Sequence, residues 1–128
     1  MKKLALAAAL VCFGSIATAD PILGTWKTQP GDDGNFAHVT LTSCGSAICG
    51  TIGKAFNGAG KSVSSDTVGK RMVWDMTASG GGKYSGGKIW APDRDKTYKS
   101  KMALSGNSLK VSGCVGPICR SQTWTRVN

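Results

Sequence analysis

The sequence has 128 residues, of which 16 are basic and 7 acidic, and its net charge is +9. This length is typical of one domain. The inventory of catalytic groups is small, because the chain has a single histidine, His38, and all of its acidic residues are aspartates. A site built on paired carboxylates, or on a nucleophile with a histidine base, is therefore not expected, and we predict that the protein is not an enzyme.

The first residues are typical of an export signal. Lys2 and Lys3 are followed by an apolar run that ends at Ile16 and by the small residues Ala17-Thr18-Ala19. A charged start, an apolar run and a small-residue cleavage site in this order predict a secretory signal peptide over residues 1–19. We expect a periplasmic or secreted protein with no transmembrane segment, because the run is shorter than the about 20 apolar residues that span a bilayer.

Residues 20–128 are expected to form a single domain of β-structure. Helical periodicity is absent, and the alternation of apolar and polar residues predicts strands. The eight predicted strands are Leu23–Gln29, Phe36–Ser43, Cys49–Ala55, Arg71–Thr77, Tyr84–Trp90, Thr97–Leu104, Ser108–Cys114 and Cys119–Val127. Turn residues join most of them, which favours an all-β, eight-stranded antiparallel up-and-down barrel or half-barrel, with a two-sheet sandwich as the alternative. The longer polar segment 56–70 is either a functional lid or a mobile loop.

Four cysteines follow the predicted signal peptide, in CGSAIC (44–49) and CVGPIC (114–119). An even number of cysteines in an exported chain predicts disulfides, and four cysteines allow three pairings. If each pair flanks a hairpin loop, its members lie opposite each other on neighbouring strands, which favours Cys44–Cys49 and Cys114–Cys119. Zinc and redox chemistry are weaker alternatives, because the lone histidine is distant from both pairs and the spacing is not C-x-x-C. We expect no metal and no cofactor.

The two ends of the domain resemble lipocalin-type barrels. Gly24-Thr25-Trp26 resembles the G-x-W that opens the first strand of these barrels, and SQTWTRV (121–127) offers a basic residue in the last strand. In that superfamily the tryptophan plugs the closed end of the barrel and the basic residue packs across it. The resemblance therefore implies that Gly24, Trp26 and Arg126 pack together at a closed end.

More specifically, the chain resembles the bacterial family called domain of unknown function 2147, which are small exported proteins with a lipocalin-like barrel. The segments that carry this resemblance are GTW (24–26), CGSAICGTI (44–52), GGKIWAPDRDKTYKSKMAL (86–104) and LKVSGCVGPICRSQTWTRV (109–127). The likeness covers essentially all of the chain after the signal peptide. It implies a fold and leaves the ligand open.

Strand alternation predicts a candidate ligand site. Three faces carry large side chains: Met72, Trp74 and Met76 on one, Tyr98, Met102 and Leu104 on the second, and Gln122, Trp124 and Arg126 on the third. If these faces point inward, they form an apolar wall with an arginine that would meet the carboxylate of a fatty acid or similar amphiphile. The candidate ligand-binding residues are Met72, Trp74, Tyr98, Met102, Trp124 and Arg126. A filled barrel would instead use the same side chains as plain core.

The positive charge suggests a second kind of partner. Removal of Lys2 and Lys3 lowers the net charge from +9 to about +7, and Lys99 and Lys101 are expected on the outer face. Such a surface attracts anionic lipid headgroups or other polyanions, or it serves solubility alone. Nucleic acid is not expected, because export removes the protein from it. The sequence thus predicts a carrier of a small hydrophobic or amphiphilic ligand; the alternative is an envelope interaction protein with a filled core that acts through its basic surface or loops.

Overall fold

A computed structural model describes residues 20–128, so the predicted signal peptide over 1–19 lies outside the described residues. The described chain consists of strands: β1 (Gly24–Lys27), β2 (Phe36–Cys44), β3 (Ala47–Phe56), β4 (Ser62–Val63), β5 (Arg71–Gly80), β6 (Lys83–Ala91), β7 (Lys96–Ser105), β8 (Ser108–Val115) and β9 (Ile118–Arg126). All eight predicted strands are present, and β4 is an additional short strand within the segment 56–70. None of the described residues forms a helix with the length and apolar character needed to cross a membrane.

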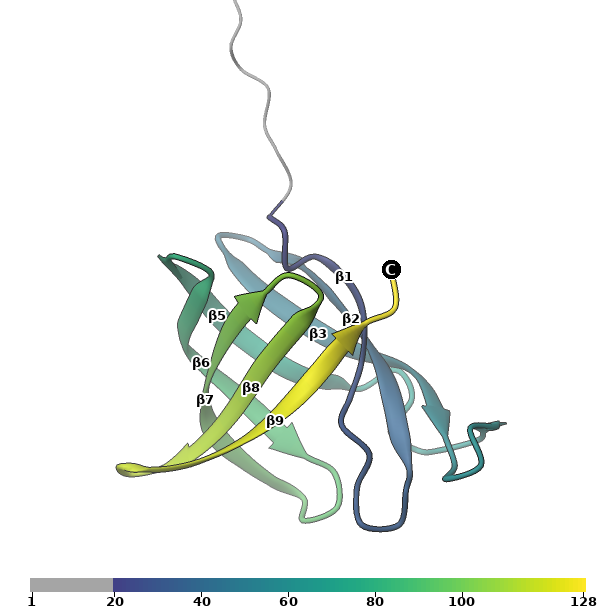
Figure 1. Cartoon of the computed structure of the whole chain (residues 1–128). Helices are drawn as coiled ribbons and strands as arrows, with labels where there is room; N and C mark the ends of the chain where they lie inside the picture. The colour runs from purple at the N-terminus through teal and green to yellow at the C-terminus, as the bar shows by residue number, and fades with distance from the viewer. Residues whose placement is uncertain (1–19) are drawn as a thin grey trace, which may run out of the picture.

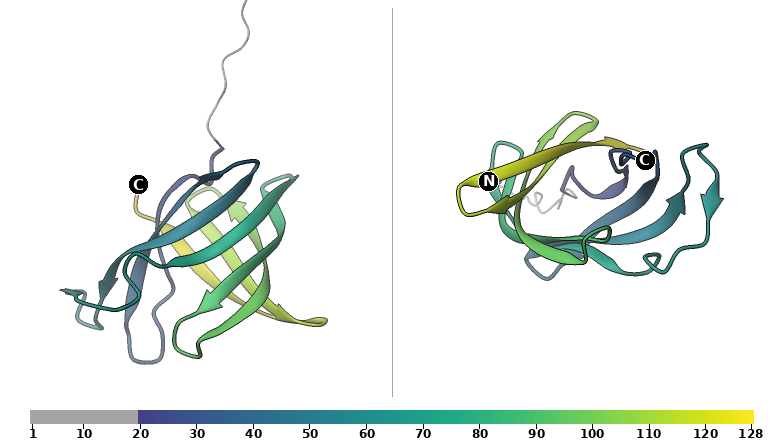
Figure 2. Two further views of the ribbon diagram at one scale, coloured as in Figure 1. Left: turned by 180° about the vertical axis from the view of Figure 1, so that it is seen from behind. Right: turned by 90° about the horizontal axis from the view of Figure 1, so that it is seen from below.

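Eight of the strands close into a barrel in which every neighbouring pair is antiparallel. The order around the barrel is β1–β2–β3–β5–β6–β7–β8–β9, and β1 closes the ring because it pairs with both β2 and β9. Figure 1 shows the up-and-down course of the strands, and the right-hand view of Figure 2 looks into the ring. The predicted all-β barrel is therefore confirmed, and the half-barrel and sandwich alternatives are not adopted.

The seam between β1 and β9 is the shortest in the ring. These strands pair only as Trp26 with Arg126 and Lys27 with Thr125, whereas β8 and β9 pair along their whole length. Beyond the seam, the side-chain Oε1 of Gln29 accepts a hydrogen bond of 2.9 Å from the backbone N–H of Thr123. The half of β9 near the β8–β9 turn therefore has a strand partner on one side only.

Both cysteine pairs form the predicted local disulfides, Cys44–Cys49 in the β2–β3 hairpin and Cys114–Cys119 in the β8–β9 hairpin. Cys114 and Cys119 lie directly opposite each other, as expected. The expectation is wrong for the first pair, whose members oppose Ala47 and Thr42 instead. The reason is the turn: β3 begins at Ala47, so Cys49 lies two residues beyond the position opposite Cys44, and the bond runs diagonally.

Removing one disulfide, in the double variant Cys44→Ser/Cys49→Ser, is expected to lower the free energy of unfolding by about 2 kcal/mol. The loss is small because the bond joins residues only 5 apart in sequence, so it restricts little of the unfolded chain. Urea denaturation measures the effect, and Cys114→Ser/Cys119→Ser, with the same separation, serves as the matched comparison. A loss above about 4 kcal/mol for either variant would show that the bond does more than close its own hairpin.

Residue 20 and the C-terminus lie at the same end of the barrel (Figure 1), and side chains close this end. Trp26 is completely buried and its indole N–H donates to the carbonyl oxygen of Ile22 at 2.9 Å. The guanidinium carbon of Arg126 lies 4.3 Å from the centre of the Trp26 ring, and its nitrogens donate to the carbonyl oxygens of Leu23 and Pro21. The arginine thus covers the tryptophan and fastens the chain that leads into β1.

Gly24 completes this closed end. Its φ of +132° is a conformation that favours glycine, and a Cβ here would lie 2.4 Å from the carbonyl oxygen of Asn128. The structure therefore brings Gly24, Trp26 and Arg126 together at one end, the arrangement that the resemblance to lipocalin-type barrels implied. At the same end, the buried Tyr84 donates its hydroxyl proton to the carboxylate of Asp20, and burial and this carboxylate both raise the pKa of the tyrosine.

Candidate functional site

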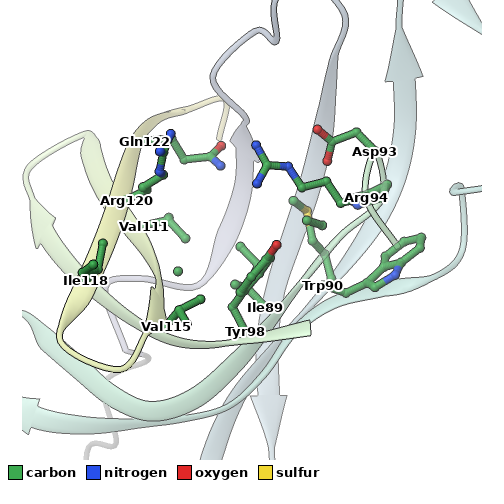
Figure 3. Close-up of a pocket in the computed structure, with 14 residues that line it drawn as sticks. Ile89, Trp90, Asp93, Arg94, Tyr98, Val111, Val115, Ile118, Arg120 and Gln122 are labelled. Carbon is green, nitrogen blue, oxygen red and sulfur yellow. The ribbon is translucent and has the colours of Figure 1, made fainter. Parts of the chain in front are cut away.

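The opposite end of the barrel contains a pocket of about 350 Å³. This volume is near the lower limit of ligand pockets in proteins. Its lining residues come from β5, β6, β7, β8, β9 and the β6–β7 loop (Figure 3): Met72, Ile89, Trp90, Ala91, Pro92, Asp93, Arg94, Tyr98, Val111, Gly113, Val115, Ile118, Arg120 and Gln122. The barrel interior is thus filled at one end and hollow at the other.

The floor of the pocket is apolar. Met72, Ile89 and Val111 are all buried and belong to the same continuous core that reaches the closed end. Gly113 on β8 contributes space, because a Cβ there would lie 3.5 Å from the Ile89 side chain and 3.6 Å from Tyr98. An apolar part of a ligand would therefore find apolar walls here, in the space that a larger residue at position 113 would fill.

Irregular pairing in β5 places Met72 in this floor. The register between β3 and β5 shifts twice, so that Gly50 opposes Val73 while Thr51 opposes Arg71, and Met72 is the extra residue of a β-bulge. Both Met72 and Val73 are consequently buried, although neighbouring residues of a regular strand face opposite sides.

Trp74 lies on the outside of the barrel, and the prediction that it shares a face with Met72 and Met76 is wrong. It pairs with the exposed Lys88 on β6, and the guanidinium of Arg71 lies 4.8 Å from its ring centre. The bulge at Met72 and the positive φ of 58° at Asp75 interrupt the alternation on which the prediction depended. Trp74 therefore does not line the pocket.

Polar groups gather on one side of the pocket. Figure 3 shows the ends of Arg94, Arg120 and Gln122 on this side, with the hydroxyl of Tyr98 pointing toward them and Val115 on the opposite side. Arg94 comes from the β6–β7 loop and Arg120 from β9. Arginine remains protonated at every ordinary pH and offers several N–H donors, so the two side chains suit a carboxylate or phosphate.

A hydrogen bond from the core fixes the orientation of the Gln122 side chain. The indole N–H of Trp124 donates to its Oε1 at 2.7 Å. Because an indole can only donate, the amide oxygen must face the tryptophan, and the NH₂ group remains free to donate elsewhere. Trp124 is completely buried, so this contact holds Gln122 against a rigid part of the core.

A hydrogen bond from the end of β6 to the β6–β7 loop helps to hold the segment that carries Arg94. The indole N–H of Trp90 donates to Oδ1 of Asp95 at 2.9 Å, and the ammonium of Lys70 lies 5.5 Å from the Trp90 ring centre. Asp95 has a φ of 50°, a left-handed conformation that aspartate tolerates better than most residues. These contacts link both ends of the short turn and limit the positions available to Arg94.

His38 lies among aromatic side chains outside the pocket. It packs against Phe56, with ring centres 4.5 Å apart, and Phe56 stacks in turn on Phe36. Burial and the nearby Lys54 and Lys27 lower the pKa of His38, which favours its neutral form. His38 does not line the pocket, and the described residues contain no group of three or more potential metal ligands.

Comparison with known proteins places the chain in a family. No curated protein matches the sequence. A family described as an uncharacterized protein conserved in bacteria (DUF2147) matches residues 24–126. The chain belongs to the DUF2147 family. The match begins at Gly24 and ends at Arg126, so it includes both residues that frame the closed end.

One solved structure extends the likeness of this DUF2147 chain to three dimensions. Protein HP1028 from the human pathogen Helicobacter pylori, described as belonging to the lipocalin family, superposes with a TM-score of 0.70 at 17% sequence identity. The superposition covers 86% of this chain and 85% of that one. At this identity the likeness establishes the lipocalin-like fold.

The six predicted ligand residues of the DUF2147 chain are divided between four places, one of which is the outer wall that carries Trp74. Met72 and Tyr98 line the pocket, whereas Met102 and Trp124 are buried in the core and Arg126 belongs to the closed end. Sequence reasoning missed the two arginines that do line the pocket. Arg120 could have been found, because it continues the alternating face of Gln122 and Trp124. Arg94 is in a loop, where strand alternation does not predict which way a side chain points.

Proposed function

We propose that this protein binds a small amphiphile with an anionic head. The apolar part would lie against Met72, Ile89 and Val111, and the head would meet Arg94 and Arg120. The observation that carries the proposal is the pocket itself, in which two guanidinium groups and the amide of Gln122 lie on one side, with the single carboxylate of Asp93 beside Arg94, above an apolar floor. Hydrogen bonds from charged donors are about twice as strong as neutral ones, so they would give the ligand a fixed orientation.

The proposal includes a non-catalytic role outside the cytoplasm. The pocket residues offer no histidine and no cysteine thiol. The two disulfides suit an oxidising, extracytoplasmic compartment. Cleavage of a signal peptide after residue 19 would deliver residues 20–128 to the periplasm or the medium. The alternative, a filled-core interaction protein, is less favoured because a pocket is present.

Calorimetric titration with fatty acids of increasing chain length tests the proposal. Affinity is expected to rise about fourfold per methylene, equivalent to about 0.8 kcal/mol, until the apolar space is filled. Replacing both arginines, in Arg94→Gln/Arg120→Gln, should weaken binding of the acid by about 100-fold or more, because each charged hydrogen bond contributes about 1.5–3 kcal/mol. An alcohol with the same chain should lose little affinity in this variant.

The matched control is Lys88→Gln/Lys110→Gln, which removes the same charge from the exposed outer wall. Its affinity for the acid should remain within about twofold of the original value, since neither lysine lines the pocket and exposed charges are screened by salt. Equal losses of affinity in the arginine and lysine double variants would mean that only net charge matters, which would contradict a role for the pocket arginines. Absence of saturable binding at every chain length would contradict the proposed function.

A further inference from the structure

The tip of the β8–β9 hairpin is the most apolar exposed feature of the described chain. Val115 is 66% exposed and Ile118 is 70% exposed, more than any other large apolar side chain between residues 20 and 128. The two residues oppose each other across a turn formed by Gly116 and Pro117, which are also exposed. Exposed aliphatic side chains gathered at one point mark an interaction site more often than single scattered ones do.

The tip is held rigidly in this exposed position. The Cys114–Cys119 disulfide joins the two strands directly behind Val115 and Ile118. Gly116 has a φ of +57°, which suits the first central position of a two-residue hairpin turn. The backbone of the tip is therefore restricted, and binding through the exposed sides of Val115 and Ile118 requires little ordering of the chain.

Basic side chains surround the base of the tip. Lys99 on β7 opposes Cys114, and Arg120 on β9 opposes Gly113, so both flank the disulfide. Arg94 lies at the rim of the pocket that Val115 and Ile118 also line. Two aspartates, at positions 93 and 95, belong to the neighbouring β6–β7 loop, and Asp95 accepts a hydrogen bond from Trp90. The charged residues that pair across the strands directly behind the tip, Lys99 and Arg120, are thus both basic.

We infer that the open end of the barrel docks on an anionic lipid bilayer, with Val115 and Ile118 inserted among the headgroups and the basic side chains against lipid phosphates. Stable attachment to a membrane surface generally needs two signals, an apolar one and a basic one, and both are present here. A protein partner is less favoured, because two side chains provide much less than the about 800 Å² per partner of a typical interface.

The pocket opens beside the tip, so a docked molecule would present it to the bilayer (Figure 3). Exchange of an anionic lipid between the membrane and the pocket would follow, and this part of the inference rests on the proposed function. Docking itself does not depend on an occupied pocket. The two can therefore be tested separately.

Vesicle co-sedimentation without added ligand tests docking. The protein is expected to bind vesicles of phosphatidylcholine mixed with phosphatidylglycerol and to bind pure phosphatidylcholine vesicles at least tenfold more weakly. Val115→Ser/Ile118→Ser should reduce binding to the anionic vesicles by about tenfold or more. The matched control Val63→Ser/Val127→Ser, which changes two exposed valines elsewhere, should leave it within about twofold.

Two lysine variants and a tryptophan introduced at the tip complete the test. Lys99→Gln should weaken vesicle binding about fivefold, whereas Lys110→Gln, at the other end of β8, should have little effect. In Ile118→Trp the emission of the new tryptophan should shift to shorter wavelength when anionic vesicles are added, and no such shift is expected for Val127→Trp. Equal behaviour of tip and control variants would overturn the inference, as would a tip-dependent dimer in size-exclusion chromatography.

A pocket-filling variant separates this inference from the proposed function. Val111→Trp should abolish fatty-acid binding while vesicle binding is retained. If the original protein binds fatty acids but no vesicles, docking is overturned and the proposed function stands. If it binds vesicles but no fatty acid, docking stands and the proposed function fails.

Discussion

Trp26→Ala is expected to lower the free energy of unfolding by about 3–5 kcal/mol, the usual cost of truncating a buried aromatic side chain. Trp26 is 0% exposed, and its ring lies beneath the guanidinium of Arg126. Truncation would leave a cavity at the closed end, deprive the carbonyl oxygen of Ile22 of its donor and remove the surface on which the arginine packs. All three effects destabilise the folded state.

Urea denaturation of Trp26→Ala beside Trp74→Ala measures this effect. Trp74 is the matched control because it is the same residue type, is partly exposed and lies on the outer wall, where truncation should cost about 1 kcal/mol or less. Similar losses for the two variants would contradict the central structural role of Trp26. Trp26→Phe should fall between them, since it retains much of the ring but loses the indole N–H.

Trp124→Ala is expected to have an effect of similar size on stability, about 3–5 kcal/mol, and also to weaken ligand binding. Trp124 is 0% exposed, and its indole N–H is the donor that fixes the amide of Gln122 at the pocket. Without this donor the amide would rotate freely, and its NH₂ group would no longer be directed away from the core. Trp124 thus links the stability of the core to the geometry of the pocket.

Trp124→Phe separates the two effects. Phenylalanine keeps most of the buried ring, so stability should fall less than in the alanine variant, but the N–H is lost completely. Affinity for a fatty acid, measured by calorimetry, should fall by about three- to tenfold, which corresponds to one neutral hydrogen bond. The alcohol of the same length is the control ligand. Unchanged affinity for the acid would mean that the orientation of Gln122 does not matter for binding.

The strands could be predicted because local chemistry specifies them, whereas the closed end was implied by the resemblance to lipocalin-type barrels. Turn residues, such as those in PGDDG (30–34) and SGN (105–107), separate segments of regular alternation. Each predicted strand forms. Gly24 and Trp26 lie in a short motif whose packing depends on residues close in sequence or at the chain end. The disulfide pairing was predictable for the same reason, since each bond closes one hairpin.

The pocket could be predicted only in part, because alternation assumes an unbroken period of two. In β5 the bulge at Met72 turns two successive side chains inward and leaves Trp74 outside. Whether the barrel is hollow depends on the summed volume of side chains from several strands, and Gly113 has its effect only once Ile89 and Tyr98 lie beside it. This total side-chain volume cannot be predicted from any one segment of the sequence.

The short seam between β1 and β9 makes the barrel unequally stiff around its circumference. Every other neighbouring pair of strands is paired over more residues than β1 and β9, and the half of β9 that carries Arg120 is bonded to β8 alone, apart from the side-chain bridge from Gln29 to Thr123. Local opening in proteins begins where the fewest backbone hydrogen bonds must be broken. The β8–β9 hairpin is therefore the most compliant wall of the ring, moving as one unit whose tip keeps its own shape through the Cys114–Cys119 disulfide, and widening of the pocket would leave the closed end and the other strands in place.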